Sequence, residues 1–117
     1  MAFTDSDIQK IKDELDILME QLRPEVSLRE KLDYRYEIDA QTASVVIIEV
    51  RPHFIEPLLK TTMPIIKAKY NKGREIWGIY WERANGKWEK YPEEPEVSNL
   101  RQFFRVLHED KLGCFFG

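Results

Sequence analysis

The segment REIWGIYWERANGKWEKYP, residues 74–92, contains all three tryptophans of the chain and a strong signal for a tight β-hairpin. Asn85-Gly86 lies between two runs rich in aromatic and β-branched residues, and both residues tolerate the positive φ of a type I′ turn. The segment therefore predicts two antiparallel strands joined by a two-residue turn.

A two-residue turn at Asn85-Gly86 determines which side chains pair across this hairpin. Arg83 then faces Trp88, Glu82 faces Glu89, Trp81 faces Lys90 and Tyr80 faces Tyr91. In this register four large apolar side chains share one face of the hairpin: Trp77, Ile79, Trp81 and Trp88. Burial of such a side chain contributes roughly 1.5 to 3 kcal/mol, so we predict that these four residues are structural core and not a ligand surface.

Three further strands are predicted before the hairpin. Residues 32–38 alternate apolar and charged side chains, as in a half-buried strand, and residues 43–52 (ASVVIIEVRP) are apolar on both faces, as in a central strand. Residues 63–70 (MPIIKAKY) form the third, and residues 53–62 a loop before it. In that third strand the apolar Ile66, Ala68 and Tyr70 face one way, and Lys67 and Lys69 face the other.

Amphipathic helices are expected at both ends of the chain. The first begins with Thr4 as its cap, ends before Pro24, and has one apolar stripe made of Ile8, Ile11, Leu15, Leu18 and Leu22. The second ends near Gly113 and has its own stripe of Val97, Leu100, Phe103, Phe104 and Leu107. The sequence therefore predicts an α+β fold, a five-stranded antiparallel meander sheet with an N-terminal and a C-terminal helix packed on it, in a single domain of residues 1–117.

Charge is distributed unevenly, although the net charge of the 117 residues is only −3. Residues 1–50 hold twelve acidic and six basic side chains, whereas residues 67–91 hold seven basic and three acidic ones. The basic region provides a candidate binding surface for phosphate groups and stacked bases: Lys67, Lys69, Lys72, Arg74, Tyr80, Lys87 and Tyr91. The acidic pair Glu82 and Glu89 would repel phosphate, so nucleic-acid binding is the alternative and not the leading hypothesis.

No catalytic constellation is apparent, so we expect a protein that is not an enzyme and holds no cofactor or metal. Cys114 with His53 or His108 lacks a third residue that would orient the histidine as a base. Asp39 and Glu49 faintly resemble the acidic pair of metal-dependent nucleases, which gives a metal-dependent hydrolase as the second alternative. Arg51 stands where such a site needs a lysine, and arginine does not lose its proton.

The remaining features concern location and partners. Cys114 is the only cysteine, and the N-terminal residues lack the pattern of a signal peptide, so we expect a cytoplasmic protein that does not enter a membrane. Phe115 and Phe116 either fold back on the sheet or make a homodimer contact. The leading hypothesis is a small interaction module with an unknown protein partner or self-association through this tail.

From Val45 onward, over nearly two-thirds of the chain, the sequence resembles a family of short bacterial proteins, the domain of unknown function 3024. The resemblance rests on four groups of residues: Arg51 and Pro52; Lys67 and Tyr70; Trp77, Trp81, Arg83, Lys87, Trp88 and Tyr91; and Asp110, Phe115, Phe116 and Gly117. Family members often carry histidine where this chain has Glu89. The resemblance implies a bacterial origin, and it brings no established activity.

Overall fold

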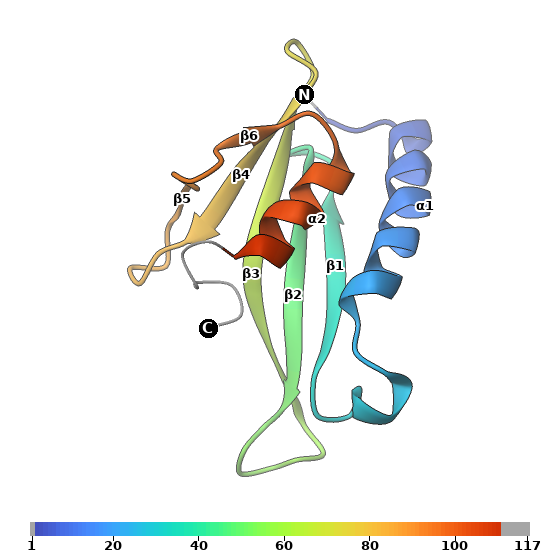
Figure 1. The fold of residues 1–117 in the computed structure, drawn as a ribbon, viewed down its shortest axis with the longest axis vertical. Helices are drawn as coiled ribbons and strands as arrows, with labels where there is room; N and C mark the ends of the chain where they lie inside the picture. Colours follow the sequence, from blue (N-terminus) through green and yellow to red (C-terminus); the bar gives the residue numbers. More distant parts are fainter. Residues whose placement is uncertain (1, 111–117) are drawn as a thin grey trace.

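The computed structural model describes residues 2–110, which form two α-helices and one antiparallel sheet. Five strands lie in sequential order across the sheet, and a short sixth strand pairs with the fourth. Both helices lie on the same face of the sheet, with α2 crossing in front of it and α1 running along its β1 side (Figure 1). The predicted α+β class and the five-stranded meander are confirmed.

Helix α1, Asp5–Leu22, begins and ends where the sequence predicts. Thr4 caps it, because the Thr4 hydroxyl accepts from the Asp7 N–H and the Asp7 carboxylate accepts from the Thr4 N–H. Its buried stripe includes Ile11 and Leu15, and Met19 joins them. After a 3-10 turn, Val26–Leu28, the chain enters the sheet.

The first three strands are β1 (Asp33–Asp39), β2 (Ser44–Pro52) and β3 (Lys60–Asn71). Strand β2 is central, as its apolar sequence predicts, and it pairs with both neighbours. Strand β3 begins earlier than predicted, at Lys60, and a register shift between Ile47 and Ile48 lies in its ladder with β2. The predicted faces of β3 are confirmed, because Ile66 and Ala68 are buried and Lys69 is exposed.

The hairpin of β4 (Ile76–Glu82) and β5 (Trp88–Lys90) differs from the predicted register by one residue. Of its loop residues only Gly86 has a positive φ, 80°. The Gly86 N–H donates to the Arg83 carbonyl and the Arg83 N–H to the Lys87 carbonyl, both at 2.8 Å, so the loop has three residues. This is a type I turn followed by a glycine bulge, because Asn85 does not take the positive φ that a type I′ turn requires.

The shift moves Trp88 to the opposite face of the sheet from Trp77 and Trp81. Trp88 pairs with Glu82, and Tyr80 pairs with Lys90. The prediction that all three tryptophans share one face is therefore wrong, because a one-residue slip reverses every side chain of a strand. Trp77 is buried and Trp81 packs at the margin of the core, whereas Trp88 is half-buried outside it.

Strand β6 (Glu96–Val97) and helix α2 (Leu100–Glu109) complete the described chain. Val97, predicted in the helix, is in β6, because Asn99 begins the helix by accepting from the Gln102 N–H. The helix ends at Glu109, since Asp110 takes a left-handed conformation with φ 42°. The end predicted near Gly113 is therefore too late, and Gly113, Cys114, Phe115 and Phe116 lie outside the described residues.

The core fills the space between the helices and the sheet. Its largest fully buried side chains come from both layers: Tyr91, Phe103, Leu15, Ile47, Ile66, Ile79, Leu107 and Val45. A polar contact also joins the layers at the end of α1, where Arg23 donates to both carboxylate oxygens of Asp33 at 2.8 and 2.7 Å. The two helices leave the other face of the sheet without a helical cover in the described residues.

Substituting Gly86 tests the glycine bulge. Gly86→Ala should lower the free energy of unfolding by about 1 kcal/mol, because an L-residue at this positive φ is strained although its Cβ has open space. Gly73→Ala is the matched control, since its Cβ meets Asn71 Oδ1 at an ordinary 3.6 Å. Urea denaturation compares the two, and equal stability of both variants would contradict the turn assignment.

Acid should weaken the contact between α1 and β1. The guanidinium of Arg23 lowers the pKa of Asp33 below its ordinary 3.8, so this pair stabilises the fold above that pH and loses its effect as the pH falls through the lowered value. Asp33→Asn should cost about 1 kcal/mol at neutral pH, and the difference from wild type should shrink below that range. Denaturation at several pH values measures it, with Glu14→Gln, an exposed carboxylate of α1, as the control.

Candidate functional site

The candidate site lies on the sheet face that the helices leave open. Strand register places two rows of side chains across this face. One row contains Glu37, Val46, Lys67, Tyr80 and Lys90, and the other contains Asp39, Ser44, Lys69, Gly78 and Glu96. Each row thus begins with a carboxylate on β1 and reaches a lysine on β3.

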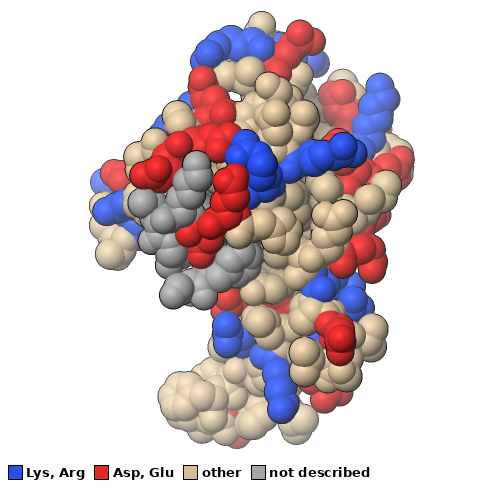
Figure 2. Space-filling view, in the orientation of Figure 1, with Lys and Arg blue, Asp and Glu red and all other residues tan. Residues whose placement is uncertain are grey.

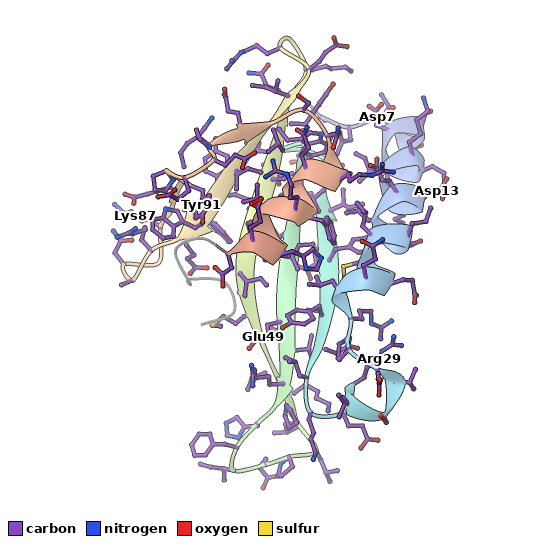
Figure 3. The ribbon with its side chains drawn as sticks, viewed as in Figure 1. Asp7, Asp13, Arg29, Glu49, Lys87 and Tyr91 are labelled. Carbon is purple, nitrogen blue, oxygen red and sulfur yellow. The ribbon has the colours of Figure 1, made fainter. Side chains whose placement is uncertain are left out.

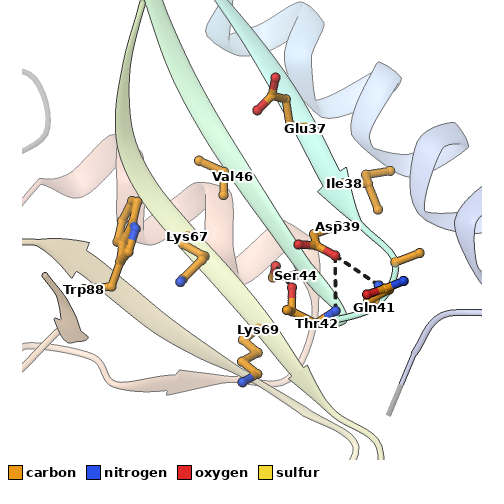
Figure 4. Close-up of a pocket in the computed structure, with 11 residues that line it drawn as sticks. Glu37, Ile38, Asp39, Gln41, Thr42, Ser44, Val46, Lys67, Lys69 and Trp88 are labelled. Carbon is orange, nitrogen blue, oxygen red and sulfur yellow. Dashed lines mark hydrogen bonds between the residues drawn. The ribbon is translucent and has the colours of Figure 1, made fainter.

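A hollow of about 760 Å³ opens where these rows cross β2. It exists because β2 contributes the short side chains of Ser44 and Val46, whereas β1 and β3 contribute long charged ones (Figure 4). Adjacent strands lie about 5 Å apart, so the acidic and basic walls are about 10 Å apart. We call this feature the sheet hollow. Its lining includes Glu37, Asp39, Ser44, Val46, Lys67, Lys69 and Trp88.

Lys67 is held at the margin of the hollow by two aromatic rings. Its Nζ lies 4.8 Å from the centroid of the Trp88 indole and 5.5 Å from that of the Tyr80 ring. Partial burial lowers the pKa of Lys67, and repulsion from Lys69 lowers it further. The Asp39 carboxylate opposes both effects, and an incoming carboxylate would do the same, because a nearby negative charge favours the ammonium form.

The opposite wall has a fixed acidic group. Asp39 begins the turn between β1 and β2, where its Oδ1 accepts from the N–H groups of Gln41 at 3.0 Å and Thr42 at 3.2 Å. The Thr42 and Ser44 hydroxyls are 2.7 Å apart beside it (Figure 4). These bonds orient the Asp39 carboxylate at the rim, where it can accept a bond from a cation.

The structure brings together only part of the predicted surface. Lys67, Lys69 and Tyr80 lie on the open face, but Arg74 is bound in a two-bond ion pair to Glu96, at 2.9 and 3.2 Å. Lys72 is exposed in the turn after β3, and Lys87 lies at the outer end of the β4–β5 hairpin (Figure 3). The predicted surface is therefore not one continuous cationic patch.

Tyr91 has a different position from the one predicted. Its ring is 1% exposed and packs edge-on against Trp81, with 5.5 Å between ring centroids. The prediction that Tyr91 could stack on a base at the surface is wrong, because the shifted hairpin register turns it toward the core. Trp88 takes the exposed aromatic position instead, although we predicted Trp88 as structural core.

The acidic wall was missed by the sequence analysis. Glu37 was interpreted only as part of the polar face of a strand, and Asp39 was considered only as a metal ligand. Two sequence features indicate this wall: the alternation of residues 32–38, and the small Ser44 and Val46 on the next strand. Strand register was also needed to find the site, because it alone places Val46 between Glu37 and Lys67.

The proposed hydrolase pair is not assembled. Asp39 pairs with Ser44, and Glu49, five residues along the same ladder, pairs with Tyr34. At about 3.4 Å per residue the two carboxylates are about 17 Å apart along the strands, too far to share an ion, so the prediction of an Asp39–Glu49 site is wrong. Glu49 instead accepts from Arg51 Nε at 2.5 Å, and residues 2–110 contain no group of three metal-ligating side chains.

The comparison with protein families agrees with the resemblance seen in the sequence. The model of the family described as Domain of unknown function (DUF3024) matches residues 3–117, essentially the whole chain. The chain belongs to this family. The match to DUF3024 includes helix α1, which the sequence analysis placed outside the similarity. No curated protein and no solved structure matches the chain.

Neither described helix of this DUF3024 member is long and apolar enough to cross a membrane. The two histidines do not lie in the sheet hollow: His53 accepts hydrogen bonds within its own loop, and His108 is at the surface. His53 Nδ1 accepts from the N–H groups of Ile55 and Glu56, both at 3.2 Å, and His108 lies exposed in the last turn of α2. Cys114 lies outside the described residues, so the geometry bears on neither of the thiol–histidine pairs.

Removing the Lys67 cation should alter the environment of one tryptophan. In Lys67→Met the indole N–H resonance of Trp88 should shift, while those of Trp77 and Trp81 stay in place, because only Trp88 faces the lysine. Stability should change by less than about 1 kcal/mol, since the cation–π gain and the desolvation cost oppose each other. Two-dimensional NMR of the indole groups checks this, with Lys69→Met as control; equal shifts for all three indoles would contradict it.

Proposed function

We propose that this chain is a non-enzymatic binding module that takes a peptide segment of a partner protein in the sheet hollow. The observation that carries the proposal is the pairing of an acidic wall with a basic wall across a floor of short side chains. The single cysteine and the resemblance to bacterial proteins support action in the bacterial cytoplasm.

Mixed charge is what selects this kind of ligand. Lys67 and Lys69 attract a carboxylate, while Glu37 and Asp39 attract an ammonium or guanidinium group on the other side. A peptide with an acidic and a basic side chain on either side of an apolar one satisfies both walls and covers Val46. Trp88, which also lines the hollow, offers its indole to that apolar side chain.

Nucleic-acid binding is the second candidate, and one observation favours it. Tyr80 and Trp88 are half-buried on an open face beside Lys67, which is the combination of ring and cation that single strands use. Against it, Glu37 and Asp39 lie about 10 Å from the lysines and would repel a phosphate chain that crossed the hollow. Lys90 and Arg74 are already paired with Glu96, at 3.3 and 2.9 Å.

The chemical groups that line the sheet hollow suit binding better than catalysis. The hollow contains carboxylates, ammonium groups and hydroxyls, but no histidine or cysteine among the residues described at its rim. Its two carboxylates lie on the same face of β1; Glu37 is 3.6 Å from the Arg35 guanidinium of the same strand, and among the described residues no ion pair joins either carboxylate to Lys67 or Lys69. Such a site recognises charge, and we propose it as a recognition surface.

Selection from a random peptide library displayed on phage tests the proposal. The bait is the purified wild-type chain, and binders are depleted against Val46→Arg, which fills the floor of the hollow. We expect the selected peptides to carry an acidic and a basic residue. The substitutions Lys67→Glu and Glu37→Lys should each lower the affinity for these peptides roughly tenfold. Peptides that bind Val46→Arg as well as wild type would refute the hollow as the site.

The Glu37→Lys variant also distinguishes the peptide-binding function from the nucleic-acid-binding one. For a fluorescent oligothymidylate, Glu37→Lys should strengthen binding because it removes a repulsive charge, whereas for a peptide of mixed charge it should weaken binding. Anisotropy titrations over a salt series distinguish these cases. If the oligonucleotide binds tightly and in a salt-sensitive way, and its affinity is higher for Glu37→Lys than for wild type, nucleic-acid binding is favoured over peptide binding.

A further inference from the structure

A second surface lies at the far end of the β2–β3 hairpin, away from the sheet hollow. The loop that joins β2 to β3 forms, with the start of β3, a projecting end of the molecule (Figure 1). We define the hairpin tip by five large apolar side chains that are 56 to 94% exposed: Phe54, Ile55, Leu58, Leu59 and Met63. In Figure 2 this end of the molecule is mostly tan, with basic side chains above it.

The hairpin tip is an ordered turn. His53 Nδ1 accepts from two N–H groups of the loop, Ile55 and Glu56, and the imidazole stacks on Phe54 with ring centroids 5.3 Å apart. The His53 N–H also donates to the Leu59 carbonyl at 2.9 Å. These bonds hold the apolar side chains outward before any partner arrives, which reduces the entropy lost on association.

The exposed apolar area is close to what a dimer interface needs. Full burial of five such side chains, at 1.5 to 3 kcal/mol each and 25 cal/mol per Å², corresponds to roughly 300–600 Å² of apolar surface, and their exposed fractions of 56 to 94% reduce this to roughly 220–440 Å². A standard interface buries about 800 Å² on each partner, of which roughly 60% is apolar. The hairpin tip of one copy therefore supplies about half or more of the apolar area that one side of a stable contact requires.

Charge at the hairpin tip is complementary to itself. Glu56 lies at the apex, between Ile55 and Pro57, and Lys60 lies at the base, where its Nζ donates to the Glu30 carbonyl at 3.0 Å. An ammonium has three donors, so the Lys60 group can bind a further oxygen. When two tips pack around a two-fold axis, the apex of one lies over the base of the other, and Glu56 meets Lys60 twice.

We propose that a second copy of this chain covers the hairpin tip, forming a two-fold dimer whose sheet hollows remain open. The acidic apex argues against a lipid surface, because Glu56 would enter the bilayer interface together with Ile55 and Leu58. The dimer is independent of the peptide site, since the hairpin tip and the sheet hollow share no residue.

Sedimentation equilibrium of the full chain tests the dimer. Wild type should show a monomer–dimer equilibrium with a dissociation constant of about micromolar. Leu58→Glu should weaken it at least roughly tenfold, because it places a carboxylate in the apolar contact. Ile17→Glu is the matched control: Ile17 is 69% exposed on α1, outside the hairpin tip, and its substitution should leave the equilibrium unchanged.

Charge exchange tests the two-fold pairing itself. Glu56→Lys alone and Lys60→Glu alone should each be monomeric, because like charges then meet at both contacts, whereas an equimolar mixture should form a heterodimer with two attractive pairs. A wild-type chain that stays monomeric near millimolar concentration would overturn the proposal, as would a dimer that Leu58→Glu leaves intact. A monomer that sediments with phosphatidylglycerol vesicles would assign the tip to lipid and overturn it too.

Discussion

The arrangement of this protein depends on one glycine bulge in the β4–β5 hairpin. Because Gly86 is the one residue of the β4–β5 loop with a positive φ, the loop has three residues, and β5 pairs one position away from the register of a type I′ turn. That single step sends Tyr91 into the core beside Trp81 and brings Trp88 out beside Lys67. The core and the open face are therefore determined by the same turn.

The two faces of the sheet have different roles because the side chains of β2 differ in length. Toward the helices, Val45 and Ile47 are fully buried and join the apolar residues of α1 and α2. On the other face Ser44 and Val46 are short compared with their neighbours on β1 and β3, so a hollow remains. A central strand whose middle is apolar on both faces thus supports a closed core on one side and a charged recess on the other.

Sequence patterns predicted the elements well and the site poorly. The capping box at Thr4, the alternation of residues 32–38 and the two faces of β3 gave the helix, the strands and their orientation, because each depends on local spacing. The position of Trp88 depends on the φ of Asn85, which Asn-Gly tolerates in more than one turn type. The charged walls depend on the register of three strands that are distant in sequence, and composition alone predicted a basic patch where the structure has a mixed one.

The uneven lengths of the strands create a gradient of local order along the molecule. Strand β4 pairs with β3 only from Lys67 to Asn71, so among the described residues β2 is the only strand that pairs with residues 60–64. Strand β1 pairs with β2 only as far as Val50, so the last two pairs of the β2–β3 ladder, Arg51 with Thr61 and Pro52 with Lys60, form a two-stranded ribbon, which is weakly cooperative. The free energy of local opening therefore falls from the layers beneath the helices toward this end of the molecule, where the hydrogen bonds of His53 retain the turn.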